Sequence, residues 1–268
     1  MTFALALALA FAAPPVHRDG AVIEDISFPA AGRDLFPSGQ TAAYRICPEK
    51  RPRRKPPGVL FVHWYDPPDK TSNRTQFIDE AVTLAQSGVC SLLIETLWSN
   101  PDWFPKRDRT KDVAQTEAIL RETRHALQFL RTFADPKRLA YVGHDFGAMA
   151  GASIAADEPQ IKTWALQAGT PQWGNWYLLG WRVEGAEREA IQQRTAHLDA
   201  TTTLKRAKGN FFFQFGRNDR FVPDAKANEF AAAAPQPAKV AWYGGGHGLD
   251  AQARQDRIAW LKQQLRLR

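Results

Sequence analysis

The sequence predicts an α/β protein with a mostly parallel sheet that helices cover on both faces. Short apolar runs rich in Val, Phe and Tyr alternate with longer segments of helical periodicity, an alternation typical of parallel sheets. The chain has 268 residues, 44% hydrophobic and 24% charged, which suits one globular domain with a sizeable core. No internal repeat or low-complexity linker divides it.

Eight segments are expected to form the strands, because they are short and alternate with longer helical patterns. They are 21–28, 41–47, 59–63, 91–95, 139–143, 163–167, 210–215 and 240–243. Five segments between or after them carry helical periodicity. They are 75–87, 112–133, 146–156, 224–234 and 251–265.

The segment from Pro171 to Lys205 interrupts this alternation. Trp173, Trp176 and Tyr177 come close together there, ahead of a charged helical stretch. Two interpretations stay open. The insert is either a short lid over a site or a pair of surface helices whose aromatic side chains pack on the edge of the sheet.

The first residues predict an export signal. Residues 3–13 form an unbroken apolar stretch, too short to span a bilayer, and Ala10-Phe11-Ala12 has the small-x-small form that signal peptidases accept. We therefore expect residues 1–12 to be a signal peptide and residues 13–268 to be a single secreted or periplasmic domain. The alternative is a disordered leader on a cytoplasmic protein, since no Lys or Arg precedes the apolar stretch.

The excess of basic residues does not indicate a nucleic-acid partner. The formal net charge is +7, but the basic residues are spread along the chain and only residues 50–55 form a dense run. That run is expected to be a solvated loop between two strands, because no aromatic-rich binding motif accompanies it. Cys47 and Cys90 permit one disulfide but equally fit two buried thiols, so their pairing stays open.

A sharp strand-to-helix turn is expected at Gly143-His144-Asp145-Phe146-Gly147, between the strand at 139–143 and the helix from residue 146. Such a turn needs glycine on both sides, because its central residue is strained and the helix must approach the strand closely. The carboxylate of Asp145 would then stand above the sheet at a helix N-terminus, where its ionised form is favoured. The alternative role for Asp145 is a helix N-cap.

Two further polar residues follow expected strands. Asp219 comes shortly after the strand at 210–215, and His247 lies in a glycine-rich turn after the strand at 240–243. Open α/β sheets carry their functional groups at the carboxyl ends of the strands. Each residue alone would be ordinary, but Asp145, Asp219 and His247 in this order predict a catalytic set.

With these residues in place, the chain resembles the α/β-hydrolases from about residue 20 to its end. It looks most like the dienelactone-hydrolase-like branch, because residues 59–64 occupy the oxyanion-loop position and only a short insert precedes Asp219. The resemblance implies an α/β-hydrolase fold and a catalytic triad of Asp145, His247 and Asp219. It also implies an oxyanion hole formed by the backbone N–H groups of Phe146 and Trp64.

The elbow residue departs from that branch, which normally has Cys or Ser there. Gly-His-Asp-aromatic-Gly is similar to haloalkane dehalogenases and epoxide hydrolases, but those families have a full helical cap, and dehalogenases typically have Trp where this chain has Phe146. Neither substrate class therefore transfers. An aromatic, rather apolar pocket for a small molecule is expected, with these candidate residues: Tyr65, Trp98, Trp173, Trp176 and Tyr177.

A carboxylate nucleophile favours chemistry at a saturated carbon. Attack on an ester would form an anhydride, whereas displacement at carbon or epoxide opening leaves an ordinary ester on Asp145. His247, oriented by Asp219, would then activate water to hydrolyse that ester. Two alternatives stay open: an ester or lactone hydrolase in which His247 activates water directly, and a catalytically silent member that binds a small molecule.

No cofactor or metal is expected. The sequence has no H-x-x-x-H or C-x-x-C spacing, no G-x-G-x-x-G run after the first strand and no P-loop. The expected partner is therefore a small-molecule substrate, with neither nucleic acid nor, after signal removal, a membrane. The oligomeric state is left open.

Overall fold

The fold is built on one nine-stranded sheet. The computed structural model describes residues 13–33, 35–50, 52–67, 73–179 and 182–267; the expected signal peptide, residues 1–12, lies outside them. The strand order is β1-β2-β3-β5-β4-β6-β7-β8-β9. The strands are β1 (Val16–Arg18), β2 (Ala21–Pro29), β3 (Gln40–Pro48), β4 (Gly58–Val62), β5 (Cys90–Ile94), β6 (Leu139–His144), β7 (Thr163–Gln167), β8 (Asn210–Gly216) and β9 (Lys239–Tyr243).

The sheet is mostly parallel, as the alternating pattern predicted. From β5 through β4 and β6 to β9 every neighbouring pair is parallel, whereas β1, β2 and β3 join antiparallel at one side. The expected number of eight strands is wrong by one, because β1 was missed. Its three residues are too few to show a period of two, and they pair with β2 across a turn in which Asp19 and Gly20 both have positive φ.

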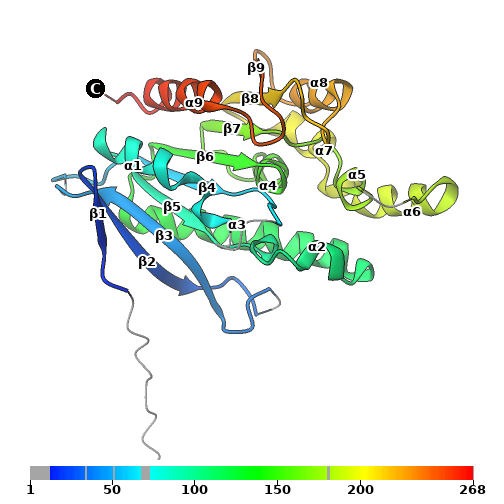
Figure 1. The fold of residues 1–268 in the computed structure, drawn as a ribbon, viewed down its shortest axis with the longest axis horizontal. Helices are drawn as coiled ribbons and strands as arrows, with labels where there is room; N and C mark the ends of the chain where they lie inside the picture. The colour runs from blue at the N-terminus through cyan, green and yellow to red at the C-terminus, as the bar shows by residue number, and fades with distance from the viewer. Residues whose placement is uncertain (1–12, 34, 51, 68–72, 180–181, 268) are drawn as a thin grey trace, which may run out of the picture.

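Helices cover both faces of this sheet (Figure 1). The five expected helices are present as α1 (Ile78–Gln86), α3 (Asp112–Phe133), α4 (Phe146–Ile154), α8 (Asp224–Ala232) and α9 (Ala251–Gln264). The alternation along β8 separates the two faces, since successive side chains of a strand point in opposite directions. Phe212 packs on Trp260 of α9, whereas Phe213 packs on Phe230 of α8.

The two halves of the insert differ in burial, and the choice between a lid and a pair of surface helices stays a prediction. Its helices α5 (Trp173–Tyr177), α6 (Gly185–Thr195) and α7 (Ala200–Thr203) follow β7, and α6 projects at the end of the molecule opposite β1 (Figure 1). Trp173 and Trp176 of α5 are buried in the main core, whereas α6 is largely exposed. The aromatic half of the insert is thus core, and the charged half stands out from it.

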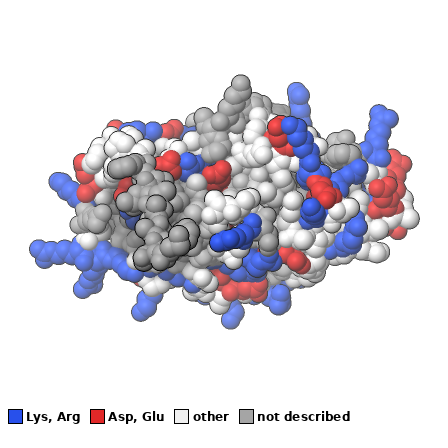
Figure 2. Space-filling model, turned by 90° about the horizontal axis from the view of Figure 1, so that it is seen from below, with Lys and Arg blue, Asp and Glu red and all other residues white. Residues whose placement is uncertain are grey.

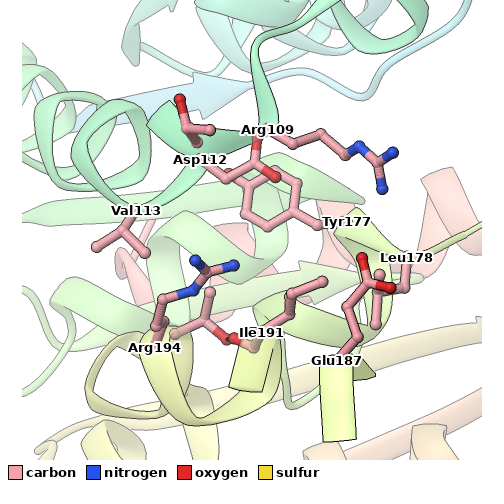
Figure 3. Close-up of a pocket in the computed structure, with 10 residues that line it drawn as sticks. Arg109, Asp112, Val113, Tyr177, Leu178, Glu187, Ile191 and Arg194 are labelled. Atoms are coloured by element: carbon pink, nitrogen blue, oxygen red, sulfur yellow. Dashed lines mark hydrogen bonds between the residues drawn. The ribbon is translucent and has the colours of Figure 1, made fainter. Parts of the chain in front are cut away.

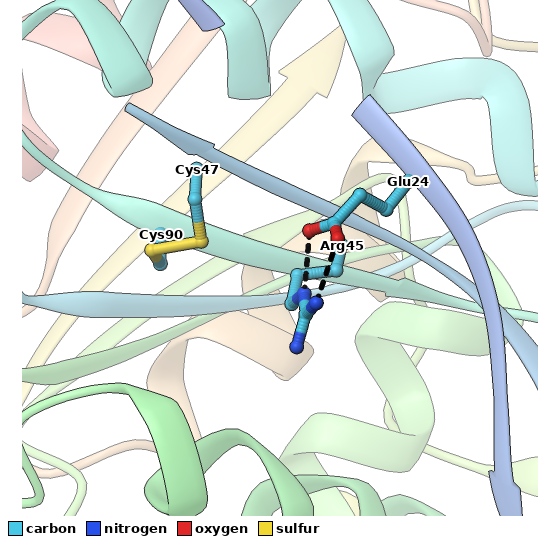
Figure 4. Close-up of a disulfide and its surroundings, with 4 residues drawn as sticks. All are labelled: Glu24, Arg45, Cys47 and Cys90. Carbon is cyan, nitrogen blue, oxygen red and sulfur yellow. Dashed lines mark hydrogen bonds and ion pairs between the residues drawn. A yellow bond between two sulfur atoms is a disulfide. The ribbon is translucent and has the colours of Figure 1, made fainter. Parts of the chain in front are cut away.

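Cys47 and Cys90 form a disulfide, which settles the pairing that the sequence left open. The bond joins the end of β3 to the start of β5, beside a bidentate ion pair in which Arg45 donates to both carboxylate oxygens of Glu24 (Figure 4). A cross-link between residues 43 positions apart restricts the unfolded chain. In the loop-entropy description this stabilises the fold by about 4 kcal/mol.

The dense basic run lies in an exposed loop. Lys50 and residues 52–55 are exposed in the loop between β3 and β4, as expected for a solvated run, and Arg51 lies outside the described residues. On the face seen in Figure 2, basic and acidic side chains are interspersed. Within the described part of the chain, none of the helices has the length and hydropathy needed to cross a bilayer.

Candidate active site

Asp145 stands at the turn between β6 and α4. Its backbone has φ 57° and ψ −119°, a conformation that an L-residue adopts only when its surroundings impose it. The two glycines permit this turn, because a Cβ on Gly143 would overlap the backbone of Gly147 and a Cβ on Gly147 would overlap the carbonyl oxygen of Val62. The strand, turn and helix are therefore arranged as the G-x-x-x-G pattern predicted.

The carboxylate of Asp145 is buried and receives two N–H donors from other parts of the chain. The side chain makes no capping hydrogen bond to α4, which removes the N-cap alternative. The backbone N–H of Tyr65 donates to Oδ2 over 3.0 Å, and the indole N–H of Trp176 donates to Oδ1. With Asp145 3% exposed, these two donors replace the water that would otherwise solvate its charge.

The loop after β4 supplies its donor one residue later than the sequence suggested. The N–H of Trp64, expected to face the elbow, donates instead to Oε1 of Gln76 over 3.0 Å, and the N–H that reaches Asp145 is that of Tyr65. The N–H directed at Asp145 is therefore that of Tyr65 and not the expected one of Trp64. Phe146 is the first residue of α4, so its N–H is one of the amides that a helix leaves without an intrahelical acceptor.

The other two expected residues meet Asp145 at the carboxyl ends of their strands. Asp219 follows β8 and His247 follows β9. Nδ1 of His247 lies 2.8 Å from Oδ2 of Asp219, and Nε2 of His247 lies 3.8 Å from Oδ2 of Asp145. Asp219 is held in turn by the N–H groups of Phe221 and Val222, which both donate to its Oδ1.

His247 lies between two carboxylates, and this environment decides its charge. Burial lowers the pKa of His247, but Asp145 and Asp219 together raise it by more, so the pKa stands at about 9 instead of 6.5. The shift favours the imidazolium form of His247 beside the carboxyl group of Asp145. Any event that neutralises Asp145 removes part of this stabilisation and lowers the pKa of His247.

Aromatic side chains surround Phe146 and wall this site. Of the pocket residues expected from the sequence, only Tyr65 and Trp176 bond to Asp145. The other three are 0–1% exposed and their polar ends bond within the protein: Trp98 to the carbonyl of His63, Trp173 to Oγ of Ser153, and Tyr177 to Oγ1 of Thr116. These three residues are core members that pack around Phe146.

A cavity of about 500 Å³ lies on the outer side of this aromatic wall. Tyr177 and Leu178 line it together with the start of α3 and the side chains of Ile191 and Arg194 from α6 (Figure 3). Because the ring of Tyr177 also packs against Phe146, the wall between this cavity and Asp145 is formed by α5.

Sequence reasoning missed how Tyr65, Trp176 and Gln76 would act. Tyr65 and Trp176 were expected only as pocket side chains, and no local signal marks an amide or indole N–H that donates to a residue 80 or 31 positions away. Gln76 lies in an ordinary helical pattern and gave no signal at all. Among the described residues, no group of three or more His, Cys, Asp or Glu side chains could hold a metal ion.

Comparison with known proteins identifies the fold. No protein-family model and no curated protein sequence matches the chain. Among solved structures, acetyl xylan esterase 1 from Thermoanaerobacterium sp. is similar with a TM-score of 0.72 and 14% identity, over 93% of this chain and 85% of that one. A protein assigned as a dienelactone hydrolase from Klebsiella pneumoniae has a TM-score of 0.65 and 15% identity, over 92% and 98%.

A third similar structure, the acetyl xylan esterase from Paenibacillus sp. R4, has a TM-score of 0.70 and 13% identity, over 93% of this chain and 87% of that one. All three likenesses extend over nearly the whole chain, as the resemblance found in the sequence implied. This protein has the α/β-hydrolase fold.

Proposed function

We propose that this protein is a cofactor-free hydrolase in which Asp145 attacks a saturated carbon and forms a covalent ester. One observation carries the proposal: a carboxylate occupies the strained elbow, between two N–H donors and 3.8 Å from an imidazole that a second carboxylate orients. An ionised carboxylate needs no base to activate it, so His247 is available for a later step.

The reaction divides into two balanced steps. In the first, Oδ1 of Asp145 forms a bond to the substrate carbon while the carbon–leaving-group bond breaks, and the leaving group departs as an anion. In the second, neutral His247 takes one proton from the water that attacks Cγ of the ester. The Cγ–Oδ1 bond then breaks, His247 gives that proton to the departing alkoxide to release the alcohol, and the proton left on the new carboxyl group passes to His247, which restores the carboxylate. The N–H groups of Tyr65 and Phe146 hold the oxyanion on Oδ2, where each such donor contributes about 3 kcal/mol.

The charge on Asp145 controls whether His247 is protonated before and after the ester forms. In the resting enzyme the imidazole is protonated and stabilises the carboxylate. Once Asp145 becomes a neutral ester, the ion pair is lost and burial lowers the pKa of His247, so that it releases its proton and can serve as a general base. Asp219 remains on Nδ1 and keeps Nε2 directed at the ester.

The donors at the site favour a leaving group that needs no proton. In this proposal the indole N–H of Trp176, which donates to Oδ1 in the resting site, turns to the leaving group as negative charge leaves Oδ1. It donates a hydrogen bond without transferring a proton at neutral pH, which suits a group such as halide or sulfonate. Opening an epoxide in line would place the new alkoxide on the far side of the carbon from Asp145, whereas the imidazole of His247 lies beside Oδ2 of Asp145, so a further acid would be required. Two tyrosines of the wall cannot serve without rearrangement, because the hydroxyl of Tyr65 bonds to the carbonyl of Pro101 and that of Tyr177 bonds to Thr116.

A single turnover in water enriched in oxygen-18 tests the covalent route. Enzyme in molar excess over substrate is mixed with a primary alkyl bromide or alkyl sulfonate. The mass of the peptide that contains Asp145 is then measured by mass spectrometry. We expect one heavy oxygen in the Asp145 carboxylate and none in the released alcohol, because the water attacks the protein ester.

The same experiment with aryl acetates and lactones, carried out in parallel, distinguishes the alternatives. Their hydrolysis without label in Asp145 would instead support direct activation of water by His247. A failure to turn over every alkyl bromide and sulfonate in the panel would reject displacement at carbon, and binding without turnover would indicate a silent member of the fold.

Replacing Trp176 by Phe is expected to lower kcat for alkyl bromides about 10²- to 10³-fold, because the site loses the indole N–H that would stabilise the departing anion. The control is Trp173→Phe in the same aromatic wall, whose indole N–H donates to Ser153 and not to Asp145. Steady-state kinetics on both variants provide the measurement. Equal losses in the two variants would show that the ring, and not its N–H, supports the reaction.

A further inference from the structure

A chain of hydrogen bonds joins the loop after β4 to the loop after β9 behind the candidate site. The N–H of Trp64 donates to Oε1 of Gln76 over 3.0 Å, and Nε2 of Gln76 lies 2.6 Å from Nδ1 of His144. Nε2 of His144 lies 2.8 Å from the backbone carbonyl oxygen of His247. Two loops that lie far apart in sequence are thus joined through Gln76 and His144.

The chemistry of these groups fixes every donor. The N–H of Trp64 can only donate, so the atom of Gln76 that faces it is the carbonyl oxygen, and the amide NH2 faces His144. Nδ1 of His144 must then accept, and Nε2 must carry the proton that goes to the carbonyl of His247. The arrangement requires a neutral imidazole with its proton on Nε2, because a proton on Nδ1 would face the NH2 group.

The surroundings of His144 keep it neutral. The side chain is fully buried at the end of β6, and the ring of Trp64 stacks on it with centroids 4.9 Å apart. Desolvation above all, together with the nearby positive charges of His247 and Arg257, lowers the pKa of His144 well below its usual value. Glu80 lies near this cluster, but it is bound to the guanidinium of Arg257.

We infer that Gln76 and His144 are positioning residues that fix the oxyanion loop and His247 relative to each other. Gln76 holds the N–H of Trp64, so the next peptide can present the N–H of Tyr65 to Asp145. His144 holds the backbone of His247, whose side chain carries the general base. This inference rests on the proposed function for its catalytic consequence, but not for its geometry.

The protonation state of His144 is measured first, on the full chain labelled with nitrogen-15 in histidine. Long-range proton–nitrogen spectra distinguish the two tautomers and follow each ring through a titration. We expect His144 to show the Nε2–H tautomer and no titration from about pH 5 to 9, while His247 titrates near the upper end. A proton on Nδ1 of His144, or titration of His144 in this range, would overturn the inference.

Gln76→Leu removes both hydrogen bonds of the amide at similar volume. We expect kcat to fall about 10- to 100-fold with KM nearly unchanged, as is common when a residue that orients a catalytic group is lost. The ring signals of His247 should shift although Gln76 does not contact its side chain. Gln86→Leu on α1, whose amide donates to the carbonyl of Asp19 away from the site, is the control and should leave both readouts unchanged.

His144→Phe and the double variant complete the cycle. Because both residues act through one chain of hydrogen bonds, the double variant should lose no more activity than the worse single variant, and additive losses would contradict the inference. The spectra are recorded without substrate, so the two proposals can fail separately. Missing oxygen-18 label rejects the covalent route, whereas a wrong tautomer, or unchanged kcat and spectra in Gln76→Leu, rejects the positioning role.

Discussion

Replacing Asp145 by Asn is expected to lower kcat about 10⁶-fold, which is the scale on which a lost nucleophile affects other hydrolases. The amide is nearly isosteric, and Asn tolerates a positive φ better than most residues, so the turn should persist. The loss reflects chemistry, because an amide does not displace a leaving group from carbon. Steady-state rates on an alkyl bromide measure it.

The same substitution has a second readout that needs no substrate. Asp145 is one of the two carboxylates that raise the pKa of His247, so this pKa should fall from about 9 toward 6.5 in the Asn variant, as a histidine titration by nuclear magnetic resonance would record. Asp199→Asn is the matched control, because Asp199 is a buried carboxylate that accepts the N–H of Trp173 and touches neither His247 nor Asp145. An unchanged pKa for His247 in Asp145→Asn would contradict the ion pair.

The raised pKa also links stability to pH. Because the folded-state pKa lies above the unfolded value, the contribution of His247 is fully present below pH 6.5 and is lost as the pH rises through about 9. The loss amounts to about 3 kcal/mol. The free energy of unfolding, measured with urea at several pH values, should therefore fall from pH 6.5 to pH 9 in the wild type. It should fall less in Asp145→Asn.

Replacing His247 by Phe is expected to stop the reaction after its first step. Asp145 would still displace the leaving group, but no general base would activate water, and removing a general base typically costs about 10²- to 10⁴-fold in rate. One equivalent of alkyl bromide should therefore release one equivalent of bromide and leave the alkyl group on Asp145. Mass spectrometry of the intact protein and of the Asp145 peptide measures the adduct.

His197→Phe serves as the control, since His197 is exposed and pairs with Glu117 on the surface. This variant should turn over normally and accumulate no adduct. Turnover in His247→Phe with no trapped ester, or an adduct on a residue other than Asp145, would exclude the two-step route. Loss of bromide release as well would show that His247 is already required for displacement.

The sequence went a long way toward the fold because its signals are local. Apolar runs and helical periodicity located eight of the nine strands and the five main helices, and two glycines marked the turn at Asp145. The order of Asp145, Asp219 and His247 along the chain also predicted which loops would meet. In an open α/β sheet, the carboxyl ends of neighbouring parallel strands lie side by side, so a residue after each strand is brought to the same edge.

Contacts between loops required the tertiary structure. The donor to Asp145 shifted from Trp64 to Tyr65 because Gln76 takes the N–H of Trp64, and nothing near residue 64 in the sequence indicates this. The sequence of the insert likewise showed a cluster of aromatic residues but not which of them face the site. Only the packing of α5 places the indole of Trp176 against the carboxylate of Asp145.

The sequence by itself determined the fold class, the strained turn at Asp145 and the three loops that meet there, because periodicity and glycine spacing act on neighbouring residues. Only the tertiary structure decided which N–H groups hold the carboxylate, how the two cysteines pair and how His144 joins two loops. Those contacts depend on the directions of hydrogen bonds between segments that meet only when the sheet is complete. No periodic pattern in the sequence encodes these directions.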